Sequence, residues 1–223
     1  MALSIAMDGP AGAGKSTVAL AVVEKLGILH LDTGAMYRAL GIGVLRAGIA
    51  LSDEQAVSAL CSKMEVTVRQ GEKGQHTFLN GEDVTALLRT PEVDQASSTV
   101  SKYADVRRQM VDLQRKLAMQ TDMLMDGRDI GTCVLPDATV KFYLTASPEE
   151  RAKRRLLQNQ QKGENDETYE EVLAGIIKRD DQDMNREVNP LRPAEDAIVI
   201  DTTEMPMDEV IELVLKIVEE KRA

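Results

Sequence analysis

The stretch GPAGAGKS, from Gly9 to Ser16, follows the pattern G-x-x-x-x-G-K-[ST]. An apolar run, Leu3 to Met7, precedes it, and a segment with Val18, Val22 and Leu26 on one helical face follows it. A glycine-rich turn between a strand and a helix lets backbone N–H groups point at phosphate oxygens. The stretch therefore predicts a binding site for a nucleoside triphosphate, although an ordinary strand–helix turn is the alternative.

Two side chains of this loop carry the expected chemistry. Lys15 is placed to contact the β- and γ-phosphates, and the Ser16 hydroxyl is a candidate ligand of Mg²⁺. The chain has no N-K-x-D motif, which GTPases usually carry for base recognition. This absence argues against a GTPase, and Mg²⁺ is the expected cofactor. The residues predicted to bind the nucleoside triphosphate are Gly9, Pro10, Ala11, Gly12, Ala13, Gly14, Lys15, Ser16 and Thr17.

Composition limits the function classes. With 223 residues and 43% hydrophobic content, the chain suits one α/β domain with a small insertion. Its net charge of −10 argues against nucleic acid or an anionic membrane as a partner. The N-terminus lacks the basic segment of a signal peptide. Cys61 and Cys133 are far apart, which favours two reduced thiols. We expect a cytoplasmic monomer.

The order of apolar segments predicts the architecture. Short strand-like runs occur at residues 3–7, 28–32, 123–126, 140–144 and 197–201, with helical patterns between them at 35–47, 105–120, from 148 and at 168–185. Alternation of this kind favours a parallel sheet covered by helices on both faces. Ser52 is expected to cap a helix over 53–61.

One region departs from the alternation. Residues 64–85 are rich in β-forming residues and contain two turns with glycine. We therefore predict a core made of residues 1–38 and 101–223, with residues 39–100 as an insertion. The core would include a lid at about residues 148–166.

Several carboxylates are expected at one edge of the sheet. Asp8, Asp32, Asp126 and Asp201 each follow a short apolar run. The carboxyl ends of parallel strands form the edge at which ligands bind. For any single residue, an ordinary turn aspartate is an equal alternative.

Basic residues indicate an acceptor that carries a phosphate. Arg38 and Arg128 follow predicted strands, while Arg179, Asp183 and Arg186 share one helical face. Each alone is better explained as a solvated charge, and Asp183 could simply pair with its neighbours. The lid segment carries more basic than acidic side chains, which would cover transferring phosphates. Its basic residues are Arg151, Lys153, Arg154, Arg155 and Lys162.

The segments GPAGAGKST, LDTGAMYR, VRRQ, DGRDIGT, LPDA and KRDDQDMNR, in this order, resemble the bacterial cytidylate kinase family. The resemblance covers residues 3 to 220. It implies an α/β P-loop kinase with a central parallel sheet flanked by helices, a β-containing monophosphate-binding insertion and a mobile lid. It also implies transfer of the γ-phosphoryl group of ATP to CMP or dCMP. The alternatives are a P-loop kinase acting on UMP, AMP or a shikimate-type acceptor, or a non-catalytic nucleotide switch.

The resemblance also implies roles for individual residues. Lys15, Arg38 and Arg128 would be catalytic, and Arg151, Arg154 and Arg155 would belong to the lid. His30 and His76 are expected to have no catalytic role, and Asp126 is open between the waters of Mg²⁺ and a turn. The implied CMP-binding residues are Thr33, Arg38, Ser98, Arg107, Arg128, Asp129, Arg179, Asp183 and Arg186.

Overall fold

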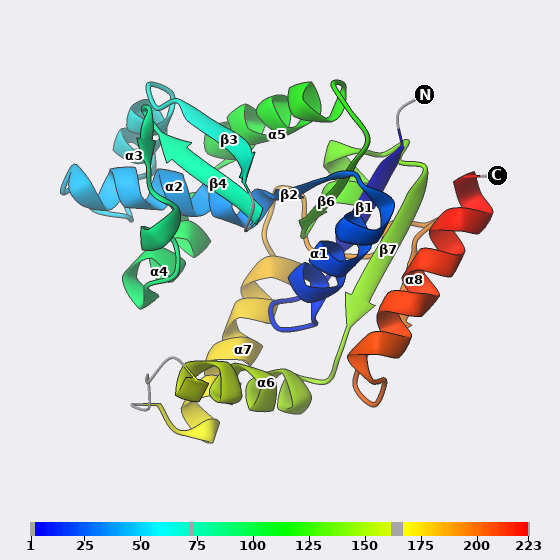
Figure 1. The fold of residues 1–223 in the computed structure, drawn as a ribbon. Coiled ribbons are helices and arrows are strands. Elements are labelled where there is room, and N and C mark those ends of the chain that lie inside the picture. Colours follow the sequence, from blue (N-terminus) through cyan, green and yellow to red (C-terminus); the bar gives the residue numbers. More distant parts are fainter. Residues whose placement is uncertain (1–2, 72–73, 162–166, 223) are drawn as a thin grey trace.

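The computed structural model describes residues 3–71, 74–161 and 167–222. Five parallel strands form a central sheet in the order β2-β6-β1-β7-β8 (Figure 1). This confirms the predicted α/β class with a parallel sheet. The strands are β1 (Ser4–Asp8), β2 (Leu29–Asp32), β6 (Met123–Gly127), β7 (Val140–Thr145) and β8 (Ile198–Asp201).

Alternate residues of the strands face two apolar clusters, as the two-residue period of a strand requires. In β6, Leu124 contacts the cluster under α1 and α8, whereas Met123 and Met125 contact the cluster under α2 and α5. Helices thus cover both faces of the sheet (Figure 1). These four helices are α1 (Lys15–Leu26), α2 (Thr33–Arg46), α5 (Ala104–Ala118) and α8 (Met207–Arg222).

Two further helices, α6 (Pro148–Gln161) and α7 (Tyr169–Met184), form a pair beside the sheet (Figure 1). Thr168 caps α7 through a reciprocal pair of hydrogen bonds with Glu171. Residues 162–166 of the expected lid lie outside the described residues.

The segment predicted to be β-rich, residues 64–85, forms strands next to α2. An antiparallel sheet of three strands packs there, and residues 72–73 lie outside the described part of the chain. Helix α4 was not predicted, although Thr90 caps it and Pro91 is its first residue. The elements are α3 (Glu54–Cys61), β3 (Val66–Gly71), β4 (Gly74–Leu79), β5 (Glu82–Asp83), the 3₁₀ turn η1 (Thr85–Leu87) and α4 (Pro91–Val100).

The division into core and insertion stays a prediction, and its boundary at residues 38 and 39 falls inside α2. One apolar cluster contains Leu31 and Met125 of the central sheet together with Val57 and Leu79 of the insertion. The insertion also contacts the edge strand through a side-chain amide. Gln75 accepts from the N–H of Asp32 at 2.8 Å and donates to its carbonyl at 3.2 Å.

Two predicted helix starts are wrong by one or two residues. Asp53, not Ser52, caps α3, because its carboxylate accepts from the Ala56 N–H at 3.0 Å. Similarly, α2 begins at Thr33 and not at Ala35, because Asp32 caps it. Both cysteines are free thiols, and Cys61 is buried. None of the described helices has the length and apolar content needed to cross a membrane.

Leu124 tests the packing of the sheet. It is fully buried between β2 and β1, so Leu124→Ala should lower the free energy of unfolding by about 3 kcal/mol. Urea denaturation followed by circular dichroism measures this change. Leu20→Ala is the control, because Leu20 is 46% exposed. Equal losses in the two variants would contradict the packing described here.

Candidate functional site

The Gly9–Ser16 loop joins β1 to α1, and its backbone has the shape that binds anions. Gly9, Gly12 and Gly14 have φ of 143°, 80° and 88°. A Cβ at Gly9 would clash with the Leu144 carbonyl of neighbouring β7. Gly14 precedes α1 and supplies no side-chain cap, so the first N–H groups of the helix are left for a ligand.

Lys15 is buried within this loop. Its Nζ donates to the Pro10 carbonyl at 2.7 Å. Burial, with a smaller effect of the positive charge of Arg128, lowers the pKa of Lys15 to about 7. A phosphate anion beside Nζ would favour the charged form. The position of this side chain therefore suits an anionic ligand.

Asp126 lies at the end of β6, next to the loop. One carboxylate oxygen accepts from the Ser16 hydroxyl at 2.8 Å, and the other accepts from His30 Nε2 at 3.1 Å. Burial raises the pKa of Asp126, but the hydrogen bond and charge of His30, the charge of Lys15 and the hydrogen bond from Ser16 together hold the pKa below its ordinary value. Hydroxyl and carboxylate oxygens side by side are the hard ligands that Mg²⁺ prefers. His30, which was expected to have no catalytic role, thus contacts this pair directly.

Metal ligands beyond this pair would have to come largely from phosphate and water. Across residues 3–71, 74–161 and 167–222, no group of three or more His, Cys, Asp or Glu side chains could hold a metal ion. Mg²⁺ commonly binds through one or two protein oxygens plus substrate phosphates. Ser16 and Asp126 fit that mode of binding.

Asp8 links the loop to the segment that follows β6. Its buried carboxylate accepts from the N–H groups of Ile130 and Gly131 at 2.8 and 2.7 Å. Burial outweighs these two hydrogen bonds and raises the pKa of Asp8 to about 6. The segment is a π-helical turn, η2 (Ile130–Val134), of a kind frequent at functional sites. The four expected edge aspartates do lie at strand ends, but only Asp8 and Asp126 of them are buried.

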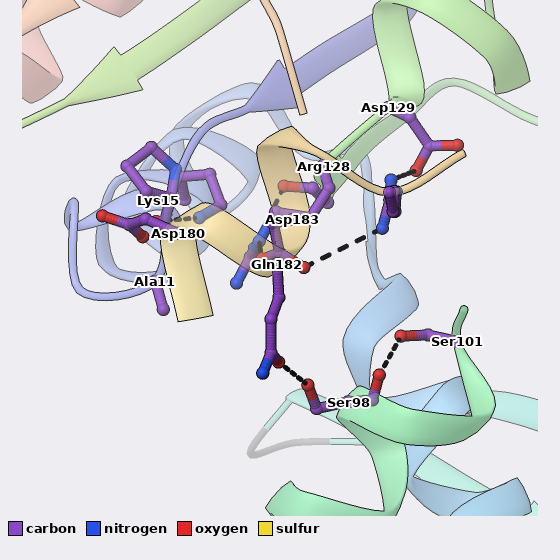
Figure 2. Close-up of polar contacts among 12 residues, drawn as sticks. Ala11, Lys15, Ser98, Ser101, Arg128, Asp129, Asp180, Gln182 and Asp183 are labelled. Carbon is purple, nitrogen blue, oxygen red and sulfur yellow. Dashed lines mark hydrogen bonds and ion pairs between the residues drawn. The ribbon is translucent and has the colours of Figure 1, made fainter. Parts of the chain in front are cut away.

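Two arginines predicted to contact the acceptor phosphate are held by carboxylates. Arg38 Nε donates to Asp94 at 2.8 Å, and Arg128 Nε donates to Asp183 at 2.9 Å. Arg128 and Asp183 lie on different elements and point toward one another (Figure 2). Asp94 was not among the predicted site residues, since its partner Arg38 is 56 residues away.

Arg179 lies between these two pairs. Within the described part of the chain it forms no ion pair, and burial and the charge of Arg128 lower its pKa to about 10. Arg155 reaches the same region and contacts Asp94 at 3.2 Å. With Asp32, whose charge also acts on Arg38, four guanidinium groups face three carboxylates, and the excess of positive charge suits an anionic phosphate.

A second cluster surrounds Asp129. Arg107 Nη2 donates to one of its oxygens at 2.6 Å, and Arg186 Nη2 donates to the other at 3.3 Å. Arg107 is fully buried, with its guanidinium 5.5 Å from the centre of the Tyr37 ring. Its Nε and the Tyr37 hydroxyl have no hydrogen-bond partner among the residues that the structure describes. Two donors at this cluster are therefore buried without a partner among those residues.

Ser98 and Thr33, the other expected CMP-binding residues, lie at opposite ends of this site. The Ser98 hydroxyl, on α4, is 3.5 Å from the Gln182 side chain on α7 (Figure 2). Thr33 is buried, and its hydroxyl donates to the Asp126 carbonyl at 2.8 Å. A Cβ at Gly127 would lie 2.8 Å from the Thr33 hydroxyl, so this approach requires glycine. A contact between Thr33 and substrate stays a prediction.

The three lid arginines do not form one free cationic face. Arg151 is buried, forms a two-pronged ion pair with Asp180 and donates to the Ala11 carbonyl at 3.2 Å. Arg154 donates to the carbonyl and hydroxyl of Thr202 at 2.6 and 3.0 Å. Arg155 extends toward the acceptor side. The three side chains differ because one side of α6 packs against α7 and the phosphate-binding loop. The local sequence does not indicate this packing.

Comparison with known proteins shows close relatives. The family model described as cytidylate kinase matches residues 5–220. A cytidylate kinase of Caldicellulosiruptor bescii is 49% identical over 215 residues, covering 96% of this chain and 95% of that protein. One of Bacillus velezensis is 50% identical over 219 residues, covering 98% and 97%. The fold is also similar to shikimate kinase from Bacteroides thetaiotaomicron, with TM-score 0.51, 12% identity and coverage of 98% and 99%.

The pKa of Asp8 predicts a pH effect. Because folding raises it from 3.8 to about 6, the folded protein retains a proton that the unfolded chain releases between these values. Ionisation of Asp8 therefore lowers the free energy of unfolding as pH rises through this window. Asp8→Asn lacks this titration, so the stability of wild type relative to the variant should fall as pH rises from about 4 to about 7.

Urea denaturation at a series of pH values measures this difference. Asp201→Asn is the matched control, since Asp201 is an exposed strand-end aspartate whose pKa is lowered by hydrogen bonds from Thr203. Its difference from wild type should stay flat across the same window. A flat difference for Asp8→Asn would refute the burial effect.

Proposed function

The chain belongs to the cytidylate kinase family, and we propose that it transfers the γ-phosphoryl group of ATP to CMP or dCMP, giving ADP and CDP or dCDP. It is an ATP-dependent phosphotransferase. The order of the groups along one edge of the sheet supports this proposal. The phosphate-binding loop with Lys15 comes first, then the arginines around Asp94 and Asp183, and then Asp129 with its arginine partners.

We assign the donor phosphates to the Gly9–Thr17 loop. Lys15 and the N–H groups at the start of α1 would hold the β- and γ-phosphates. Ser16 and Asp126 would hold Mg²⁺, directly or through water. When bound, the ion neutralises charge that develops on the phosphates during transfer. The uncapped helix and the adjacent oxygen ligands support this assignment.

We assign the acceptor phosphate to Arg38, Arg128 and Arg179. The attacking atom is a phosphate oxygen, which is already ionised at neutral pH, so transfer needs no general base. The protein would contribute by aligning the two phosphates and by stabilising the charge between them. The excess of positive charge at this position supports the assignment.

We assign the base to Asp129, Arg107 and Ser98, and the sugar side to Asp183 and Arg186. A carboxylate can accept from the exocyclic amino group of cytosine, as aspartate and glutamate do when they contact this base in nucleic acid. Arg107 and Ser98 can donate to ring N3 and O2. Uracil presents a carbonyl in place of the amino group, so Asp129 would repel it. The buried, unpartnered Nε of Arg107 supports a ligand here.

We also propose that Mg²⁺ is the metal, that the reaction belongs to pyrimidine nucleotide metabolism, and that the protein is a cytoplasmic monomer. Light scattering after size-exclusion chromatography would measure the mass of the particle, for which 24.5 kDa is expected.

An acceptor panel tests the proposal. ADP release is measured with Mg-ATP and CMP, dCMP, UMP, AMP, GMP or shikimate. CMP or dCMP should give the highest kcat/KM, because the amino group of cytosine pairs with Asp129. A higher value for UMP, AMP or shikimate would identify a different small-acceptor kinase. ATP binding without transfer to any acceptor would identify a nucleotide switch.

Asp129→Asn tests base recognition. The change keeps the shape of the side chain but lets the amide donate to the carbonyl of uracil. The ratio of kcat/KM for CMP to that for UMP should fall by about a hundredfold. Asp181→Asn is the control and should keep the wild-type ratio, because Asp181 is an exposed aspartate of α7. A ratio unchanged by Asp129→Asn would rule out the assigned role.

Asp126→Asn tests the metal assignment. The variant should need about tenfold more Mg²⁺ for half-maximal activity, with the KM for CMP unchanged. Activity is titrated with Mg²⁺ at fixed ATP and CMP concentrations. Asp112→Asn is the control, because Asp112 is exposed on α5, away from this pair. Identical Mg²⁺ curves for wild type and Asp126→Asn would exclude Asp126 from the metal site.

A further inference from the structure

We propose that Asp94 is a positioning residue for the acceptor phosphate, which orients Arg38 and draws Arg155 over the same position. The inference rests on the proposed function, in which Arg38 holds that phosphate. Asp94 itself would not touch the substrate. Its two carboxylate oxygens contact arginines from two different sides of the site, one from α2 and one from α6.

The contact with Arg38 is directional. The Arg38 Nε donates to one oxygen of Asp94 at 2.8 Å, with 12% of the Arg38 side chain and 19% of the Asp94 side chain exposed. The two terminal nitrogens of Arg38 make no hydrogen bond with any residue in the described ranges. A guanidinium held at Nε presents its terminal pair to an anion in a fixed direction. Asp94 therefore decides where that pair points.

The start of α2 leaves room for this orientation. The Arg38 side chain extends back over Gly34, where an added Cβ would lie 2.9 Å from Nη1. Any side chain at this position would meet the guanidinium. Glycine at residue 34 thus leaves the space that the guanidinium occupies, and Asp94 holds the guanidinium there through Nε.

Backbone packing makes the pair rigid. Helices α2 and α4 approach closely at Gly41, where an added Cβ would lie 3.1 Å from the Ser97 nitrogen and 3.2 Å from the Ala96 Cβ. Arg38 precedes Gly41 by three residues, and Asp94 precedes Ala96 by two. Both charged residues therefore lie within one helical turn of a close crossing. Their separation follows from the packing of two helices and does not depend on a mobile loop.

The second oxygen of Asp94 connects α4 to α6. Arg155 Nη2 donates to it at 3.2 Å. Ser98 lies four residues further along α4, on the same face, and contacts Gln182 of α7 at 3.5 Å. One face of α4 thus meets the α6–α7 pair twice, at the phosphate end through Asp94 and at the base end through Ser98. The acceptor assigned to this site would lie between these helices.

A positioning role and a purely electrostatic role predict opposite effects when the charge is removed. A carboxylate beside an anion site repels the anion, so its loss alone would strengthen binding of a phosphate. If Asp94 orients Arg38, its loss weakens binding although the site becomes more positive. The sign of the change therefore distinguishes the two roles.

The experiment measures CMP binding by titration calorimetry without ATP, together with steady-state kinetics. Asp94→Ala should weaken CMP binding and raise the KM for CMP by about tenfold, because a charge-assisted hydrogen bond is lost. The KM for ATP and the melting temperature should stay near the wild-type values. Asp94→Asn should lose less, since its remaining oxygen can still accept from Nε. Glu92→Ala, an exposed carboxylate of the same helix, is the control.

A double variant tests the second half of the proposal. Arg155→Met should weaken CMP binding in the wild-type background but should add nothing to Asp94→Ala, because without Asp94 the Arg155 guanidinium is no longer held over the acceptor phosphate. Additive losses would overturn this link, since Arg155 would then act independently of the carboxylate.

The remaining outcomes separate this inference from the proposed function. A wild type that neither binds nor phosphorylates CMP would overturn the function. A wild type that does so, with Asp94→Ala binding CMP equally or more tightly, would overturn the positioning role alone. If Asp94→Ala raised the KM for ATP and for CMP equally and lowered the melting temperature, the ion pair of Asp94 would be structural only. This result would also overturn the positioning role.

Discussion

The parallel pairing of β1 with β6 is the constraint on which the site depends. It places Asp8 opposite Gly127. The phosphate-binding loop and the segment with Arg128 and Asp129 therefore leave the sheet at the same edge. The pairing of β2 with β6 places Asp32 opposite Asp126 in the same way, next to the start of α2. Segments more than 90 residues apart in the chain therefore supply donor, metal and acceptor groups to one edge. Asp8 then fixes the loop after β6 by two hydrogen bonds to its backbone.

Burying this much charge has a cost, and the contacts show how the fold limits it. Among the buried arginines of the acceptor side, Arg38 and Arg107 form ion pairs with carboxylates. Arg179 lies close enough to Asp183 and Asp94 to be stabilised by their charges. Isolated burial of such charges would be strongly unfavourable. The carboxylates are fewer than the arginines at the phosphate end. The folded protein thus keeps an unbalanced positive charge where an anion would complete it.

Local sequence patterns were sufficient for the sheet and for the phosphate-binding loop. Apolar strands of four to six residues and a glycine pattern between a strand and a helix need only neighbouring residues to be identified. Helix α4 was missed because its buried face includes Ala96 and Ser97, which are too small to give a hydrophobic period. The roles of Asp94, Asp8 and Arg151 could not be read, because their partners lie 56, 122 and 29 residues away. Such contacts exist only once the fold is formed.

The amide of Gln75 has a consequence for the outer edge of the central sheet. Strand β2 ends the sheet on one side, and an edge strand exposes N–H and C=O groups to which another chain can add a strand. Gln75 engages both backbone groups of Asp32, as a neighbouring strand would. Gln70 donates to the carbonyl of His30 in the same manner. The side chains of Gln70 on β3 and Gln75 on β4 therefore occupy the backbone groups to which another strand would add. The β3–β4 hairpin thus also protects the central sheet from aggregation.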